Sequence, residues 1–282
     1  DIARKTDFVA GVVGWIDMLQ ENFAARLDHY AAQEKWIGLR PMLQGHDPAL
    51  IADPRFRASL SDVARRGIPF DILTFPRHLP AMIEALRATP GVHAILDHIS
   101  KPDMTRPMEA GWAEGITALA AIPGLHCKIS GLVTEAGPDW SAERIRPFVT
   151  HVARAFGPQR LVFGSDWPVC TLAASHAHVV DLARDLLGGM VGADAMQGIF
   201  ETNALRVYRS DLNGWEMRDA RQRPSAARFS SSSLCSTRAE KARRSRIGLA
   251  ERWIGRVARS IGRTRRSQRI APLQILPRSS LR

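Results

Sequence analysis

The sequence contains few cysteines and no long apolar run. Its three cysteines, Cys127, Cys170 and Cys235, are an odd number without the paired spacing of zinc-binding motifs, so a disulfide framework is not expected. No apolar run approaches the roughly 20 residues of a membrane-spanning helix, and the first residues lack the order of a signal peptide. We therefore expect a soluble, cytoplasmic protein with reduced thiols and no membrane partner.

A glycine-rich phosphate-binding loop is also missing. No apolar run is followed by a Walker or dinucleotide-binding pattern of glycines. This absence argues against nucleotide chemistry.

Positive charge is concentrated at the end of the chain. The formal net charge of +11 would by itself suggest a nucleic-acid partner. Residues 1–208, however, contain 20 Lys and Arg against 23 Asp and Glu, whereas residues 209–282 contain 19 against 5. The first region is therefore mildly acidic, and we expect no nucleic-acid partner for it.

Residues 209–282 form the second of two predicted regions. They are rich in arginine and serine and contain few aromatic residues. A basic nucleic-acid-binding arm is one interpretation. We favour a disordered or non-native extension, such as the translation of a shifted reading frame. Sequencing the encoding DNA would distinguish the two.

Short apolar runs recur along residues 1–208 and are typical of buried parallel strands. They lie at Phe8–Met18, Trp36–Leu43, Ile68–Phe75, Val92–Ile99, Leu125–Leu132 and Arg160–Trp167. Helical patterns follow at 48–66, 79–89, 107–121, 141–156, 175–188 and 193–207. Repeated strand-helix units of this length predict a parallel α/β sheet.

Charged residues stand where these runs end, which favours a barrel over an open doubly wound sheet. In a (β/α)8 TIM barrel the strand C-terminal ends carry the active site, and the fold takes about 250 residues. Six units in residues 1–208 leave roughly two units unaccounted for. We expect these two units to precede the sequence, so that the first region is a partial barrel.

The clearest single motif is Gly164-Ser165-Asp166-Trp167-Pro168, directly after an apolar run. A carboxylate beside a tryptophan at a strand end is partly desolvated, so its pKa rises and it can take a proton from water. It could equally bind a metal ion that acidifies water. A helix-capping aspartate is the structural alternative.

A second motif, Asp97-His98-Ile99-Ser100-Lys101-Pro102, places three ionisable groups in one loop after a strand. This combination suits metal ligation or an oxygen-rich substrate. A purely structural histidine is the alternative, but three such groups are costly to gather without a use.

Three further residues are candidates for substrate binding. His78 lies in a turn bracketed by prolines, Arg40 follows the second run, and Lys128 interrupts the fifth. An arginine can clamp a carboxylate or carbonyl oxygen, and a lysine pointing inwards needs an anionic partner or substrate. A solvated loop histidine and a buried structural ion pair are the respective alternatives.

Taken together, these segments resemble the amidohydrolase-related (amidohydrolase 2) family of TIM barrels, which includes sugar lactonases such as L-fucono-1,5-lactonase and L-rhamnono-lactonase. The matching stretches are VAGVVGWIDM, GLRPMLQ, PFDILTFPRHLP, LDHISKP, CKISGLVTEA, FGPQRLVFGSDWPVC and NALRVY. By this resemblance the six runs are strands three to eight of a barrel of the metal-dependent-hydrolase type.

The resemblance implies a hydrolase that opens a cyclic ester, a sugar-acid lactone, with activated water in carbohydrate catabolism. It implies Asp166 and His98 as catalytic residues and as ligands of one divalent metal, zinc. It places Arg40, His78, Lys101, Lys128 and Trp167 around the substrate. The H-x-H pair that the family carries on its first strand is absent, which puts the metal in doubt. An oligomer is compatible with the sequence.

Two other functions stay open. Barrels of this type also host decarboxylases and other hydrolases, because a fold does not fix a reaction. The polypeptide could instead be an inactive fragment, since an opened barrel exposes strand edges. Hydrolysis of aldonolactones by the purified chain would exclude the fragment hypothesis.

Overall fold

Six short parallel strands form the centre of the computed structural model, which describes residues 2–6 and 9–208. They pair in the order of the chain, from β1 to β6. Each lies inside one of the six predicted runs, so the predicted parallel α/β architecture is confirmed. The strands are Val12–Gly14 (β1), Trp36–Leu39 (β2), Phe70–Ile72 (β3), Ala94–Leu96 (β4), His126–Ile129 (β5) and Leu161–Phe163 (β6).

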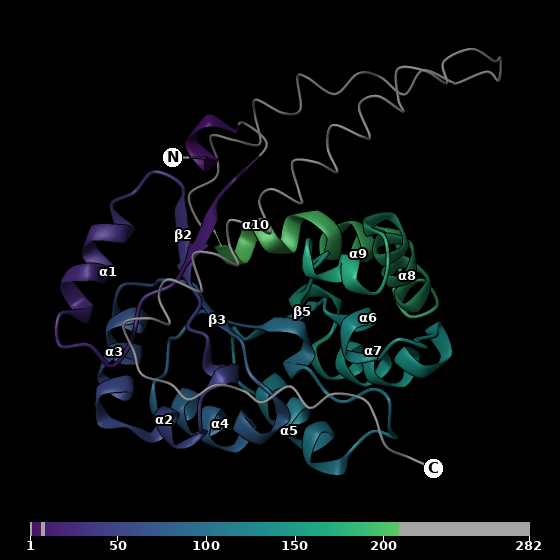
Figure 1. Ribbon diagram of the computed structural model, residues 1–282, viewed down its shortest axis with the longest axis horizontal. Coiled ribbons are helices and arrows are strands. Elements are labelled where there is room, and N and C mark those ends of the chain that lie inside the picture. Colours follow the sequence, from purple (N-terminus) through teal and green to yellow (C-terminus); the bar gives the residue numbers. More distant parts are fainter. Residues whose placement is uncertain (1, 7–8, 209–282) are drawn as a thin grey trace, which may run out of the picture. The chain divides into compact units, whose positions relative to one another are not determined.

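Helices connect the strands, and Figure 1 shows most of them in an arc around the sheet. The six predicted helical segments are confirmed, whereas α1 and the short α6 are additional. The helices are Phe23–Ala31 (α1), Ala49–Ala52 (α2), Pro54–Arg65 (α3), Leu79–Ala88 (α4), Ala110–Ala120 (α5), Leu132–Glu135 (α6), Ala142–Phe156 (α7), His176–Gly188 (α8), Ala193–Gln197 (α9) and Asn203–Tyr208 (α10).

The two faces of the sheet carry different side chains. Apolar residues such as Phe70, Leu96 and Cys127 are fully buried in the main core with the helices. Successive residues of a strand point to opposite faces, so their neighbours Asp71, Ile95 and Lys128 face the other way. This inner face therefore combines apolar with charged groups.

The last helix, α10, covers part of the inner face. Val207 packs with Ile95 of β4 and Val162 of β6 in a small separate core. The side-chain amide of Asn203 donates hydrogen bonds to the carbonyl oxygens of Pro158 and Leu161, at 2.8 and 2.7 Å. These bonds tie the start of α10 to the start of β6.

Some predictions fall outside the described residues. Residues 209–282, predicted to be a disordered or non-native tail, are among them. The two strand-helix units predicted upstream also stay a prediction. Within the described residues, no helix is long and apolar enough to cross a membrane.

Candidate active site

The loop after β4 has an unusual backbone. His98, Ile99, Ser100 and Lys101 are all left-handed, with φ angles of 51°, 47°, 60° and 50°. The left-handed region costs roughly 1–2 kcal/mol per L-residue, and it is particularly unfavourable for a β-branched residue such as Ile99. We call this segment the left-handed turn (residues 98–101).

Contacts from two other parts of the chain hold the left-handed turn. The indole N–H of Trp112, on α5, donates to the carbonyl oxygen of Ile99 at 2.9 Å. The hydroxyl groups of Thr74 and Ser100 lie 3.0 Å apart, and both residues are fully buried. The tertiary structure, rather than local preference, therefore stabilises the turn.

The turn directs the ring of His98 towards β5 and β6. Its Nδ1 atom lies 2.8 Å from the hydroxyl oxygen of Ser130, and its Nε2 atom lies 3.7 Å from Oδ1 of Asp166. Burial lowers the pKa of His98 to about 4, so the ring is neutral at pH 7. Gly131 leaves room for this ring, because a Cβ atom there would lie 2.9 Å from Cβ of His98.

Asp166 follows β6 and also has a positive φ, of 56°. Burial raises the pKa of its carboxyl group, which confirms the desolvation expected from the motif. The adjacent Trp167 is more than half exposed. Asp166 and His98 thus face each other at the C-terminal ends of β6 and β4, as the barrel interpretation requires.

Lys128 lies between two buried carboxylates. Its Nζ atom is 2.5 Å from Oδ2 of Asp71, on β3, and 2.7 Å from Oδ1 of Asp97, after β4. Burial alone would lower the pKa of Lys128, but the two carboxylates outweigh it and the pKa is raised. Arg40 lies 3.5 Å from Oδ2 of Asp97. We call Arg40, Asp71, Asp97 and Lys128 the ionic cluster.

The remaining candidates are placed differently. Lys101 forms an ion pair of 2.9 Å with Glu135, at the edge of the site. His78 is fully buried, and both of its ring nitrogens are engaged with backbone: Nδ1 accepts from the N–H of Phe75 at 3.1 Å, and Nε2 lies 3.0 Å from the carbonyl oxygen of His46. In this arrangement no ring nitrogen of His78 is left for a substrate.

The family model for amidohydrolases matches residues 1–210. The chain belongs to the amidohydrolase family. An L-fucono-1,5-lactonase from Burkholderia ambifaria is 37% identical over 215 residues, which are 75% of this chain and 74% of that protein. An L-rhamnono-gamma-lactonase from Scheffersomyces stipitis is 24% identical, over 61% of this chain and 58% of that protein.

A crystal structure also resembles this amidohydrolase. It is that of an amidohydrolase from Burkholderia multivorans with bound zinc, which is 32% identical. The match has a TM-score of 0.69 and covers 73% of this chain and 76% of the other. The six parallel strands therefore belong to a TIM-barrel fold of the amidohydrolase type, as predicted.

Several neighbours of the site in this amidohydrolase escaped the sequence analysis, namely Asp71, Ser130, Glu135 and Tyr208. One signal was present: Asp71 interrupts the apolar run of β3, as Lys128 interrupts that of β5. Two opposite charges on the same face of buried strands need each other as partners. Ser130 and Tyr208 carry no comparable signal.

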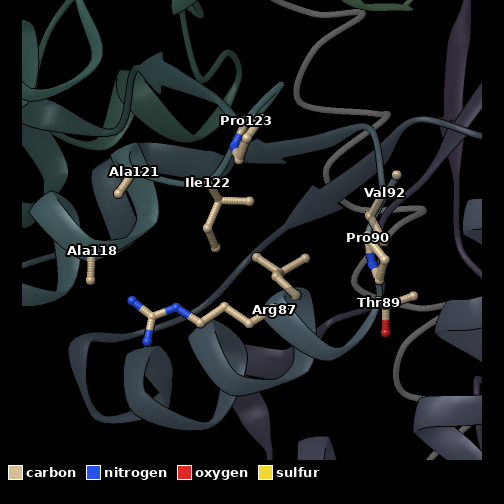
Figure 2. A pocket seen from close by; sticks show the side chains of 10 residues that line it. Arg87, Thr89, Pro90, Val92, Ala118, Ala121, Ile122 and Pro123 are labelled. Carbon is tan, nitrogen blue, oxygen red and sulfur yellow. The ribbon is translucent and has the colours of Figure 1, made fainter.

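A cavity of about 410 Å³ lies near the N-terminal ends of β4 and β5, away from the strand ends that carry Asp166 and His98 (Figure 2). It is lined by residues of α4 and α5 and of the segments that precede β4 and β5, among them Arg87, Val92 and Ile122. It contains none of the paired ionisable groups described above. In TIM barrels the chemistry takes place at the C-terminal strand ends, so this cavity is not the candidate active site.

A zinc ion is not completely accommodated by the described residues. His98, through Nε2, and Asp166 offer two ligands, whereas a catalytic zinc usually keeps three protein ligands. No group of three histidine, cysteine, aspartate or glutamate residues suited to a metal occurs in residues 2–6 and 9–208. We therefore assign no catalytic step to a metal.

Proposed function

We propose that the chain belongs to a hydrolase that opens the ring of a sugar-acid lactone, with L-fucono-1,5-lactone as the first substrate to test. The observation that carries the proposal is the pairing of Asp166 and His98 at the strand ends of a chain that is 37% identical to an L-fucono-1,5-lactonase. The similarity to an L-rhamnono-gamma-lactonase supports the same substrate class.

Asp166 would act as the general base. Its desolvated carboxylate takes a proton from water while the water oxygen attacks the carbonyl carbon of the lactone. The tetrahedral intermediate then breaks its bond to the ring oxygen, which leaves with the proton held by Asp166. The products are a free hydroxyl group and the carboxylic acid of the open chain, which releases its proton to the solvent and so becomes a carboxylate.

His98 would stabilise the oxyanion of the intermediate, and Arg40 would bind an oxygen of the substrate equally in the ground state and in the transition state. If the hydroxyl of Ser130 donates to Nδ1, the neutral ring of His98 carries its proton on Nε2, the atom that faces Asp166. Arg40 retains two-fifths of its side-chain surface exposed, so its guanidinium group can reach an oxygen of the substrate. Lys101 and Trp167 border the same strand ends.

The site could also take a divalent metal ion as part of this proposal. If a divalent ion such as zinc binds, His98 and Asp166 are the ligands that the described residues would contribute, and the ion would polarise the lactone carbonyl or acidify water. The mechanism above uses only the side chains of the chain.

The substitution Asp166→Asn tests the proposal. It keeps the shape of the side chain but removes the base, so we expect kcat for L-fucono-1,5-lactone to fall at least about a hundredfold. Asp181→Asn, at an exposed position of α8, serves as the control and should keep its activity. Turnover is followed with a pH indicator. Undiminished turnover of Asp166→Asn would remove Asp166 from its role.

A further inference from the structure

Three members of the ionic cluster, Asp71, Asp97 and Lys128, are buried charges that the proposed mechanism does not use. Asp71, Asp97 and Lys128 come from β3, from the loop after β4 and from β5, and they meet on the inner face of the sheet. The carboxylates are 1% and 0% exposed, and the ammonium group is 16% exposed. Two carboxylates at 2.5 and 2.7 Å engage two of the three N–H donors of this ammonium group, so at most one donor remains for a substrate.

The charges of the cluster balance only when Arg40 is included. Two carboxylates and one ammonium group leave one negative charge, and Arg40 supplies the second positive charge at 3.5 Å from Asp97. Within the cluster, Arg40 is also the residue with the most exposed side chain, at 41%. The cluster therefore extends from the buried inner face to the position proposed for the substrate.

Tyr208 fixes the buried end of the cluster. Its hydroxyl group donates a hydrogen bond of 2.5 Å to Oδ1 of Asp71, and its ring centroid lies 5.3 Å from Nζ of Lys128. With Tyr208 on Oδ1, Asp71 presents Oδ2 to Lys128. Tyr208 thus joins α10 to the cluster.

We propose that Lys128 is a positioning residue: held by Asp71 and Tyr208, it fixes Asp97, and Asp97 in turn orients Arg40 towards the substrate. This inference rests on the proposed lactonase function and replaces the expectation that Lys128 itself binds substrate. Its physical basis is charge balance, because removing one partner from a buried ion pair leaves an uncompensated charge. Without Lys128, two carboxylates compete for Arg40, which moves inwards and away from the substrate.

The kinetic test compares Lys128→Met with the double variant Lys128→Met/Asp71→Asn, which removes one positive and one negative charge. For Lys128→Met we expect KM for L-fucono-1,5-lactone to rise about tenfold or more while kcat changes less than about threefold, since a binding interaction is lost. The double variant should recover most of this loss, because Asp97 and Arg40 then balance each other. Lys128→Arg, which keeps the charge, should lie between wild type and Lys128→Met.

Two outcomes would overturn the proposal. If the double variant is as impaired in KM as Lys128→Met, Lys128 contacts the substrate directly. If Lys128→Met lowers kcat and leaves KM unchanged, Lys128 acts in the chemical step. Tyr208→Phe provides a milder variant that removes only one hydroxyl group, and we expect a rise in KM of about twofold to threefold.

Urea unfolding separates failure of this inference from failure of the proposed function. Lys128 and Arg40 share Asp97, so the effects of Lys128→Met and Arg40→Gln on the unfolding equilibrium should be non-additive by about threefold or more. This coupling needs no substrate. If the wild-type protein hydrolyses no aldonolactone but the coupling is present, the lactonase proposal fails and the cluster stands. Additive effects would contradict the cluster itself.

Discussion

At the scale of single residues, burial of His98 makes the stability of the protein sensitive to acid. The pKa of His98 is lowered to about 4 in the folded state, against an ordinary value of 6.5. Between these pH values the unfolded chain binds a proton that the folded protein does not. The free energy of unfolding therefore falls as the pH falls through this window, by roughly 3 kcal/mol at most from this group.

The substitution His98→Gln should flatten this dependence. We expect the free energy of unfolding of the variant to change less between pH 6.5 and pH 4 than that of the wild type. Urea unfolding of chelator-treated protein at several pH values measures it, with His176→Gln, at an exposed position of α8, as the control. An unchanged slope in His98→Gln would show that the ring is not the titrating group.

Sequence patterns singled out two residues that lie close together in the structure, but they did not reveal the partner of Lys128. Asp166 and His98 were predicted to be catalytic, and in the structure Nε2 of His98 lies 3.7 Å from Oδ1 of Asp166. The partner of Lys128, Asp71, lies 57 positions away in the sequence. Local periodicity contains no information on such a pair, and only the need of each buried charge for a counter-ion points to it.

At the scale of elements, the turn after β5 sets the space available to the ring of His98. Gly131 has a φ of 67°, and a Cβ atom there would approach the ring of His98 to 3.0 Å. Gly124 has a similar φ of 77°, but a Cβ atom there would meet nothing within 4 Å. The two glycines therefore separate the cost of backbone strain from the cost of a steric clash.

We expect Gly131→Ala to be more damaging than Gly124→Ala. Both variants lose about 1 kcal/mol or more of stability because an alanine is strained at positive φ. Only Gly131→Ala should also displace His98 and lower kcat/KM for the lactone, by about tenfold or more. Steady-state kinetics and urea unfolding of both variants test this expectation. Equal kinetic effects would mean that Gly131 is needed for its backbone conformation alone.

The strands were predictable from the sequence, whereas α1 and the left-handed turn were not. Continuous apolar runs identify buried parallel strands. Helix α1 buries only Phe23 and Leu27, and the side chain of Asn22 makes no capping hydrogen bond, so its local signals are weak. The left-handed turn contains neither glycine nor asparagine, the residues that usually indicate this conformation.

At the scale of the whole described unit, the two edges of the sheet have different properties. The C-terminal edge carries Asp166, His98 and the ionic cluster, whereas the cavity beside α4 and α5 lies at the N-terminal edge (Figure 2). This difference can be tested with one kind of substitution at both edges. Arg40 and Arg87 are the matched arginines.

We expect Arg40→Gln to lower kcat/KM for L-fucono-1,5-lactone about tenfold or more, because a binding interaction with an oxygen of the lactone is lost. Arg87→Gln, in the cavity at the other edge, should leave kcat/KM within about twofold. Initial-rate measurements of the two variants in parallel decide the matter. A larger fall in kcat/KM for Arg87→Gln than for Arg40→Gln would indicate that the active site lies in the cavity.

The left-handed turn also makes the site dependent on contacts with the rest of the fold. A peptide of residues 94–104 cut from the chain would lose its contacts with Trp112, Thr74 and Ser130. Because L-residues prefer right-handed backbone, residues 98–101 of this peptide would then leave the left-handed conformation. The histidine would no longer be presented in the same direction. The direction of this ring thus depends on contacts with distant parts of the polypeptide, and partial unfolding that detaches α5 would remove the hydrogen bond from Trp112.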